Sequence, residues 1–150
     1  MALETAGIWW RGHTYLHDQS SNSYGLEAAT ALGVPASLVF KTLIAEVEGI
    51  GLAVGIVPVD HLLDLKAFAK ATGGKRAEMA NMSEAQRSSG YVVGGISPIG
   101  QRRSLPTYLD ESAIVSERIF VSGGRRGFDI EIAPDDLIAV TEGQYAKIAR

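Results

Sequence analysis

The spacing of apolar residues predicts a helix near each end of the chain. Residues 24–33, YGLEAATALG, carry leucine and alanine at helical intervals, and Gly33 supplies a stop. Ser23 comes just before this segment, and we expect it to cap the first turn. Residues 133–141, APDDLIAVT, predict a second helix, with Pro134 at a position that suits a first helical turn.

Runs of β-branched and aromatic residues predict two hairpins and one further strand. Residues 38–47, LVFKTLIAEV, continue through the turn EGIG into residues 52–59, LAVGIVPV. Residues 118–122, RIFVS, continue through GGRRG into the alternating residues 128–132, FDIEI. Residues 90–95, GYVVGG, begin as a strand and stop in glycines.

Two more helices are expected between these hairpins. In residues 61–74, HLLDLKAFAKATGG, the apolar positions form one face, glycine ends the segment, and Asp60 is placed to cap its start. Ser83 and Gln86 have the spacing of a capping box over a short helix that ends at Gly90. Helices and hairpins therefore interleave, which predicts an α/β (α+β) fold with a mixed sheet and helices packed on it.

Composition places this fold in one ordinary domain. The chain has 150 residues, of which 46% are hydrophobic and 21% charged, close to the average for soluble globular proteins. No linker, repeat or change of composition divides it, so we expect a single domain over residues 1–150. Its apolar runs are too short to cross a bilayer, and we expect a cytoplasmic protein with no membrane partner.

The absence of cysteine and the distribution of charge limit the reactions and binding partners that the sequence allows. The chain has no cysteine, which excludes disulfides, thiolate metal ligands and a cysteine nucleophile. A net charge of −3 disfavours wholesale binding to nucleic acid, and no DNA partner is expected. The basic residues are nevertheless paired in three loops, which together would form a positive rim for a phosphate backbone. These pairs are Lys75 with Arg76, Arg102 with Arg103, and Arg125 with Arg126.

Lys41 is the most unusual charged residue, because it interrupts the apolar run SLVFKTLI. Burying an unpaired ammonium group would cost several kcal/mol, so its head group must reach solvent or an anion. It lies either on the wet face of an edge strand or at the wall of a cleft, where it would hold a phosphate or a carbonyl oxygen. Thr42 would point to the opposite face unless a bulge intervenes.

The histidine-rich segment HTYLHD is a weak metal candidate. His13 and His17 share a face only in a helix, with Asp18 beside them, whereas the surrounding aromatic and threonine residues favour a strand. We therefore expect no metal and no cofactor. Tyr15 is either an aromatic wall residue or part of the core. The chain also lacks a Gly-x-Ser-x-Gly elbow and a Walker loop, so conventional hydrolase machinery is missing.

A glycine-rich turn follows the strand expected at residues 90–95. Gly94 and Gly95 remove side chains where that strand stops, which lets backbone groups approach a ligand closely. Pro98 restricts Ser97 to extended conformations. The segment is either a structural bulge and tight turn or the wall of a binding pocket.

Three motifs, taken together, resemble a known family. The segments YGLEAATALG…VFKTLI, GYVVGGISPIGQRRSLPTYLD and VSGGRRGFDIEIAPDDLI are similar in order and spacing to the YbaK/EbsC family, free-standing relatives of the editing insertion in bacterial-type prolyl-tRNA synthetases. The similarity runs from about Tyr15 to Thr141. It implies a curved, barrel-like mixed sheet flanked by helices, and an activity that removes a wrong amino acid from transfer RNA.

The resemblance also assigns roles residue by residue. It implies that Lys41 engages the terminal phosphate or the aminoacyl ester, with Gly94 and Tyr15 as the other catalytic positions. The residues implied to bind the substrate are Thr42, Tyr91, Ser97, Ser122 and Asp129. The tRNA-binding positions expected from the basic loops are Arg102, Arg103, Arg125 and Arg126.

The implied function is trans-editing deacylation of Cys-tRNA(Pro). In the YbaK branch, the thiol of the cysteinyl substrate attacks its own ester carbonyl, so no protein nucleophile is needed. The expected partners are aminoacylated tRNA(Pro) and a prolyl-tRNA synthetase in a ternary complex. Two alternatives stay open: a deacylase for Ala-tRNA(Pro) or another mischarged tRNA, and a non-catalytic module that binds tRNA or a synthetase.

Overall fold

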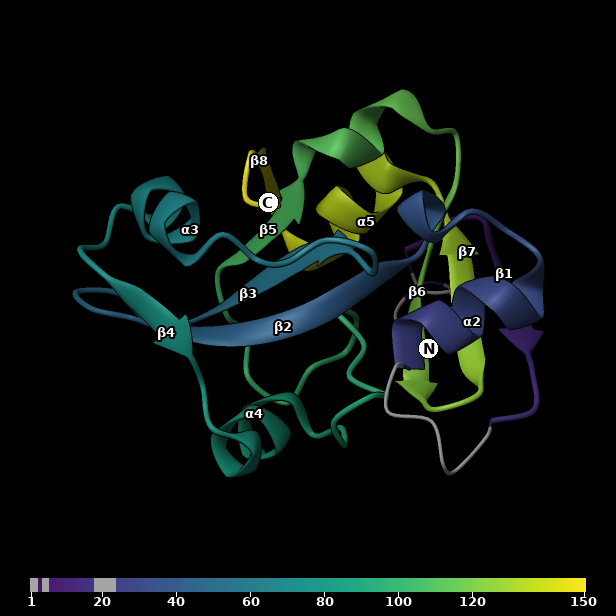
Figure 1. The fold of residues 1–150 in the computed structure, drawn as a ribbon, viewed down its shortest axis with the longest axis horizontal. Helices are drawn as coiled ribbons and strands as arrows, with labels where there is room; N and C mark the ends of the chain where they lie inside the picture. The colour runs from purple at the N-terminus through teal and green to yellow at the C-terminus, as the bar shows by residue number, and fades with distance from the viewer. Residues whose placement is uncertain (1–2, 4–5, 18–23) are drawn as a thin grey trace.

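The strands of the protein form two sheets that pack against each other (Figure 1). The computed structural model describes residues 3, 6–17 and 24–150. Ser23, the expected cap of the first helix, and Asp18 lie outside the described residues. A β-bridge between Val39 and Phe120 links the two sheets, and the main core fills the space between them.

One sheet has three antiparallel strands and the other has five strands of mixed direction. The first sheet has the order β1 (Trp10–Thr14), β7 (Phe128–Ile132) and β6 (Ile119–Arg125). The second has the order β4 (Ala77–Met79), β2 (Phe40–Val47), β3 (Gly51–Pro58), β5 (Thr107–Asp110) and β8 (Gln144–Ala146). Both predicted hairpins, β2–β3 and β6–β7, are confirmed.

Helices cover the sheets on several sides. The α-helices are α2 (Tyr24–Leu32), α3 (Leu65–Thr72), α4 (Met82–Ser89) and α5 (Pro134–Thr141). Short 3₁₀ turns are η1 (Ala36–Leu38) and η2 (Glu111–Val115). Figure 1 shows α2 beside the three-stranded sheet, with α3 and α4 on different sides of the β2–β3 ribbon. The α+β fold with a mixed sheet and packed helices is confirmed, and the three-stranded sheet is wholly antiparallel. None of the described helices is long and apolar enough to cross a membrane.

Side chains of β2 and β3 alternate between two apolar clusters. Ile44, Val54 and Ile56 belong to the core between the sheets. Their neighbours Ala45 and Ala53 face the other way, into a cluster built around Phe68 of α3. This period of two is the expected consequence of pleating, and it buries both faces of the ribbon.

The start of α3 differs from the sequence-based prediction. Asp64 is the N-cap, because its Oδ1 accepts a hydrogen bond from the Ala67 N–H at 3.0 Å, and Asp60 is exposed in a turn. The residues between them pair with the C-terminus: Leu62 exchanges backbone hydrogen bonds with Arg150. Extended pairing and helical geometry exclude each other, so the helix begins only at Leu65.

The predicted cap of α4 is also wrong. Asn81 accepts a hydrogen bond from the Glu84 N–H at 2.8 Å, and Ser83 lies inside the helix. Gln86 Oε1 does not return to the helix start but accepts from the Val93 N–H at 3.1 Å. The glycine ends of both helices, Gly73 and Gly90, are confirmed as left-handed caps.

Residues 90–95 do not form the predicted strand. The backbone N–H groups that a strand would donate to a neighbouring strand are donated locally instead. The Tyr91 N–H donates to the Ser89 hydroxyl, the Val93 N–H to the Gln86 side chain, and the Gly95 N–H to the Val92 carbonyl. The β-branched residues here are therefore part of a loop. The three strands that no pattern predicted, β4, β5 and β8, have only three or four residues each.

Asp110 ties the C-terminus to the five-stranded sheet. Its carboxylate is 4% exposed; Oδ1 accepts from the N–H groups of Ile148 and Ala149, at 3.0 and 2.9 Å, and Oδ2 accepts from Ser112 at 3.2 Å. Burial by itself would raise the pKa of Asp110, but the hydrogen bonds from the Ser112 hydroxyl and these backbone groups outweigh it and lower the pKa. The ionised carboxylate is thus a structural acceptor.

We expect Asp110→Asn to lower the free energy of unfolding at pH 7 by about 1–3 kcal/mol, because one oxygen acceptor becomes a donor facing a backbone N–H. Because folding lowers the pKa of Asp110, its ionised carboxylate adds to the free energy of unfolding at pH values above 3.8, the ordinary pKa. This added stability is lost as the pH falls through the pKa of Asp110 in the folded protein. The difference between the two proteins should therefore shrink in acid. Urea denaturation at pH 7 and pH 3 measures it, with the exposed Glu111→Gln as control; a difference that persists unchanged at pH 3 would contradict the assignment.

Candidate active site

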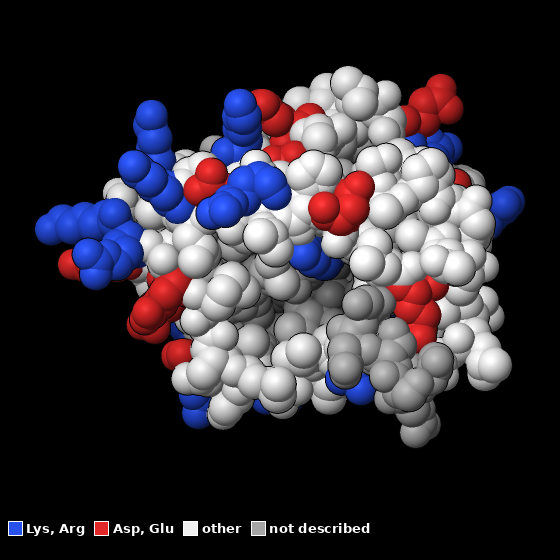
Figure 2. All heavy atoms as spheres, in the orientation of Figure 1, with Lys and Arg blue, Asp and Glu red and all other residues white. Residues whose placement is uncertain are grey.

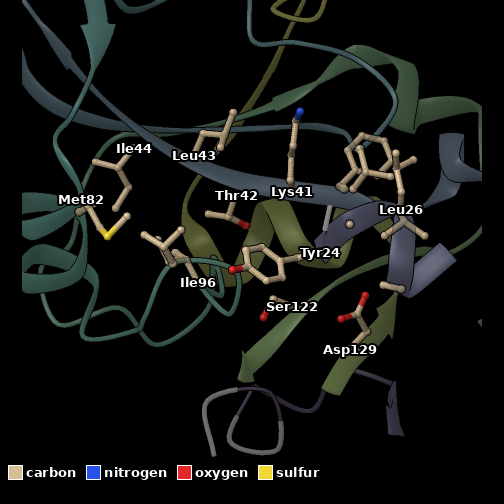
Figure 3. A pocket seen from close by; sticks show the side chains of 18 of the residues that line it. Tyr24, Leu26, Lys41, Thr42, Leu43, Ile44, Met82, Ile96, Ser122 and Asp129 are labelled. Carbon is tan, nitrogen blue, oxygen red and sulfur yellow. The ribbon is translucent and has the colours of Figure 1, made fainter. Parts of the chain in front are cut away.

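A cavity of about 540 Å³ opens where β2, α2, the start of α4 and the loop of residues 93–96 meet (Figure 3). The same face of the molecule is visibly hollowed near its centre (Figure 2). Its polar lining residues are Tyr15, Tyr24, Lys41, Thr42, Ser122 and Asp129. Its larger apolar lining residues are Leu26, Phe40, Leu43, Ile44, Met79, Met82 and Ile96. In Figure 3 the polar Ser122 and Asp129 lie on one side, and Met82, Ile44 and Ile96 on the other.

Lys41 and Thr42 reach this cavity from opposite sides of β2. They are consecutive residues of one regular strand, paired with Val57 and Ile56, so no bulge brings them to the same face. Figure 3 shows the Thr42 hydroxyl directed toward Tyr24 and the Lys41 chain directed away from it. Burial lowers the pKa of Lys41, and the negative charge of Asp60 partly opposes that shift. Lys41 is thus one of the residues that line the cavity, and its catalytic role stays a prediction.

Thr42 carries a hydroxyl without a hydrogen-bond partner among the described residues. The residue is 8% exposed, and its Oγ1 is one of two buried, unpaired side-chain atoms in that part of the chain. Leaving such a group unsatisfied costs about 1–3 kcal/mol. A polar atom held at that cost inside a cavity is placed to bind a ligand.

Asp129 puts a carboxylate at the polar side of the cavity. It lies on β7 opposite Ser122 of β6, is 5% exposed, and accepts no hydrogen bond from the described residues. Burial raises its pKa from 3.8 to about 7. The Ser122 hydroxyl accepts from the Gly124 N–H at 3.2 Å. Burial, together with the charge of Asp129, also raises the pKa of Tyr15 to about 12, so Tyr15 stays neutral.

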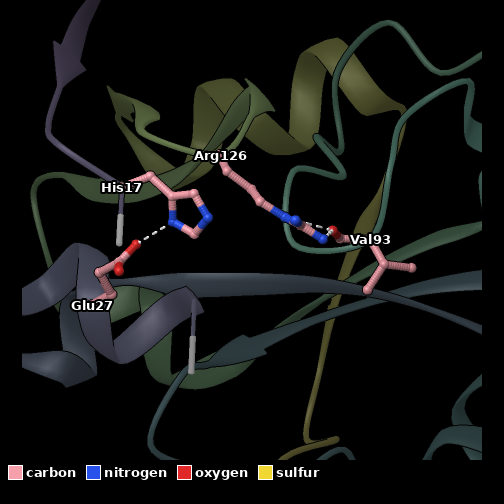
Figure 4. Close-up of polar contacts among 4 residues, drawn as sticks. All are labelled: His17, Glu27, Val93 and Arg126. Carbon is pink, nitrogen blue, oxygen red and sulfur yellow. Dashed lines mark hydrogen bonds and ion pairs between the residues drawn. The ribbon is translucent and has the colours of Figure 1, made fainter. Parts of the chain in front are cut away.

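The loop that carries Gly94 is pinned to the cavity by an arginine (Figure 4). Arg126 Nε donates to the Val93 carbonyl at 3.0 Å, and its guanidinium lies 4.3 Å from the centre of the Tyr24 ring. Gly94 has φ +88°, and a Cβ there would lie 2.7 Å from both Arg126 Nε and the Tyr24 ring. Only glycine fits this backbone, which explains the glycine predicted at the pocket wall.

Two of the expected substrate-binding residues do not line the cavity. The Tyr91 hydroxyl donates to the Ile99 carbonyl at 2.6 Å, and the buried Ser97 hydroxyl accepts from the Ile99 N–H at 3.2 Å. Both residues hold the loop behind the cavity wall. Sequence reasoning in turn missed Tyr24, Ile44 and Met82; Tyr24 stands in the family-like motif, but no local pattern separates a pocket aromatic from a core one.

The expected tRNA-binding arginines are placed differently from one another. The Arg126 side chain donates a hydrogen bond to the Val93 carbonyl of the Gly94 loop, and the Arg125 guanidinium lies 5.0 Å from the centre of the Phe128 ring. Arg102 and Arg103 are exposed, and their backbone N–H groups bond to the carbonyls of the α4 end. Their role in binding tRNA stays a prediction.

The histidines near the N-terminus are separated. His13 Nε2 lies 2.8 Å from Glu131 Oε1, and His17 Nδ1 lies 2.7 Å from Glu27 Oε1 (Figure 4). Within residues 3, 6–17 and 24–150, no three metal-ligating side chains come together. The segment around His13 is strand β1, as its aromatic and threonine residues predicted.

Residues 22–140 match the sequence profile of the aminoacyl-tRNA editing domain. The chain belongs to the aminoacyl-tRNA editing domain family. An Enterococcus faecalis protein, provisionally named Cys-tRNA(Pro)/Cys-tRNA(Cys) deacylase EbsC, is 42% identical over 120 residues, which cover 80% of this chain and 73% of that protein. The family resemblance noted from the motifs is thereby confirmed.

Two further relatives connect this editing domain to prolyl-tRNA synthetases. The proline–tRNA ligase of Shouchella clausii is 32% identical over 127 residues, covering 78% of this chain and 22% of that protein. A crystal structure described as a candidate trans-editing enzyme for prolyl tRNA synthetase superposes with a TM-score of 0.83 and 28% identity, covering 99% of this chain and 92% of that one.

Removing the unpaired hydroxyl should stabilise this editing domain. We expect Thr42→Val to raise the free energy of unfolding by about 1 kcal/mol, because the buried Oγ1 loses no hydrogen bond when it is replaced by a methyl group. Urea denaturation gives the value, and Thr42→Ser, which keeps the hydroxyl, is the control. A less stable Thr42→Val would mean that the hydroxyl is satisfied in the folded protein.

Asp129 should make stability fall as pH rises. The pKa of Asp129 is about 7 in the folded protein and 3.8 ordinarily, so between these pH values the folded protein binds one proton more than the unfolded protein. We expect Asp129→Asn to be more stable than the wild type at pH 8, by up to about 4 kcal/mol, since one pKa unit corresponds to about 1.4 kcal/mol. Denaturation midpoints of both proteins from pH 4 to pH 8 provide the measurement; parallel curves would contradict a buried, unpaired carboxyl.

Proposed function

We propose that the protein is a trans-editing deacylase that removes cysteine from mischarged Cys-tRNA(Pro). The observation that carries this proposal is one cavity lined by an ammonium, a hydroxyl and a carboxyl, from Lys41, Thr42 and Asp129; the hydroxyl and the carboxyl have no hydrogen-bond partner among the described residues. None of the described lining residues is a histidine or cysteine, so the cavity holds neither a serine–histidine pair nor a cysteine nucleophile among them. Membership of the editing family and the name of the Enterococcus faecalis relative support this substrate class.

An aminoacyl ester offers groups that match this cavity. Its α-ammonium is a cation that would pair with the Asp129 carboxylate, and such pairing would lower the raised pKa of Asp129. Lys41 would hold the terminal phosphate or the developing oxyanion, where one charged donor is worth about 3–4 kcal/mol. Gly94 would bring the bare backbone of its loop close to the ester. Thr42 would give its free hydroxyl to the bound aminoacyl group.

The ester is already activated, so positioning can supply most of the catalysis. In the proposed step the cysteinyl sulfur attacks the ester carbonyl and a C–S bond forms. The bond from the carbonyl carbon to the ribose oxygen breaks, and the thiol proton ends on that oxygen. The tRNA leaves with a free hydroxyl, and the amino acid leaves as a four-membered thiolactone that water opens to cysteine. The protein contributes orientation, charge and exclusion of water.

Editing of this kind meets a physical need of the synthetase. A synthetase pocket gains only about 1–3 kcal/mol from one methylene, so a pocket for proline cannot fully reject cysteine or alanine. A second site of different shape has to remove the products of such errors. We propose that the protein acts on tRNA released by, or still held in a ternary complex with, prolyl-tRNA synthetase.

The decisive test is turnover by the Lys41→Ala variant. With Cys-tRNA(Pro), we expect deacylation to fall at least about a hundredfold, because one preorganised charged donor is lost. Lys147→Ala, which removes an exposed lysine outside the cavity, is the matched control, and thermal melting checks that both variants fold. Unchanged turnover in Lys41→Ala would refute its catalytic role.

A substrate panel tests the amino-acid assignment separately. tRNA(Pro) charged with cysteine, alanine, serine or proline is incubated with the wild-type protein, and loss of the amino acid is followed over time. We expect cysteine to be released fastest. Rapid release of alanine but not cysteine would overturn the cysteine assignment, and tRNA binding without any release would indicate a non-catalytic module.

A further inference from the structure

Four basic side chains gather at the end of the molecule formed by α3 and β4. They are Lys66, Lys70, Lys75 and Arg76, named here the α3–β4 basic cluster. All four residues are exposed. Figure 2 shows Lys and Arg side chains concentrated over α3 and beside β4, on the same face as the central hollow. A protein with a net charge of −3 thus presents a concentrated positive surface next to its candidate active site.

The backbone below this cluster is held firmly. A groove of about 260 Å³ between α3 and β4 is lined by Leu65, Lys66, Ala69, Lys75, Arg76 and Ala77. The Lys75 N–H bonds to the Glu48 carbonyl at 3.0 Å, and the Glu48 N–H bonds to the Arg76 carbonyl at 2.7 Å. A Cβ on Gly74 would lie 2.3 Å from Val47 Cγ1, so the loop packs directly on the β2–β3 turn. The charges are therefore presented on a fixed surface.

The basic side chains of the cluster are not neutralised within the described protein. None of the four forms a salt bridge with a carboxylate of residues 3, 6–17 or 24–150, although Glu46, Glu48 and Glu78 are exposed nearby. By contrast, Arg126 is engaged by the Val93 carbonyl and Tyr24, and Arg125 by Phe128. The four cations of the cluster are therefore free to meet an anion, unlike the two arginines in the turn of the β6–β7 hairpin.

We propose that the α3–β4 basic cluster binds the phosphate backbone of the tRNA whose aminoacyl end enters the cavity; this rests on the proposed function. Neutralising a phosphate with a lysine or arginine releases bound counterions, so four free cations make a substantial, salt-dependent contribution to affinity. Phosphate contacts position an RNA without reading its sequence. The cluster would thus orient the acceptor end toward Lys41 whatever amino acid it carries.

The test compares two variants from which equal charge has been removed. One carries Lys66→Gln, Lys70→Gln, Lys75→Gln and Arg76→Gln; the control carries Arg11→Gln, Arg87→Gln, Lys147→Gln and Arg150→Gln, which are all exposed and lie outside the expected tRNA-binding set. Fluorescence anisotropy with uncharged tRNA(Pro) gives Kd between 50 and 200 mM salt, values of the order used for such slopes. We expect the cluster variant to bind at least about tenfold more weakly, with a salt slope lowered by about 3–4, and the control to change less.

Turnover separates this proposal from the proposed function. The cysteinyl ester of adenosine lacks the phosphate backbone, so the cluster variant should hydrolyse it at the wild-type rate while losing kcat/KM on Cys-tRNA(Pro). If the wild type cleaves neither substrate, the proposed function fails, but the anisotropy comparison still tests the cluster. Wild-type tRNA affinity in the cluster variant would overturn the proposal. So would weaker binding confined to the control, or a loss of prolyl-tRNA synthetase binding with tRNA affinity intact.

Discussion

The antiparallel pairing of β2 with β3 fixes the direction of every side chain along β2, and the candidate site depends on it. The register runs without a break from Phe40 opposite Pro58 to Val47 opposite Gly51. A slip of one residue would exchange the faces of Lys41 and Thr42 and would turn Ile44 out of the core. Both faces of the ribbon are buried against separate apolar clusters, so such a slip is strongly disfavoured.

The cavity retains polar groups at a cost to stability. Neither Thr42 Oγ1 nor the desolvated Asp129 carboxyl has a hydrogen-bond partner in the described part of the chain, although apolar side chains would fill the same space more favourably. Asp110 shows the contrast, because three backbone N–H groups satisfy its carboxylate and its pKa is lowered. Two buried aspartates of this protein thus have opposite environments, one suited to structure and one to a ligand.

Positive charge is likewise divided between two uses. Arg126 bridges from the β6–β7 turn to the Val93 carbonyl and the Tyr24 ring, and it holds the Gly94 loop at the cavity wall. The α3–β4 basic cluster has no such internal engagement with described carboxylates. A basic pair in a turn and a basic pair after a helix look alike in sequence. Only the neighbours in the folded structure show that one pair contains an arginine that holds a loop in place and that the other pair is free to bind an anion.

Local patterns in the amino-acid sequence were enough to predict the fold class, the two long hairpins, α2, α5 and the glycine ends of α3 and α4, because periodicity and turn residues act locally. The motifs around Lys41, Gly94 and Asp129 also determined the family. Tertiary structure decided what local patterns cannot express: that the C-terminus pairs with residues 62–64 and moves the cap from Asp60 to Asp64, and that side chains of α4 satisfy the loop at 90–95. It also decided which polar residues share the cavity and which, like Tyr91 and Ser97, stand behind it. These outcomes depend on contacts between residues far apart in the chain or on competition for one hydrogen-bonding group, which no single segment records.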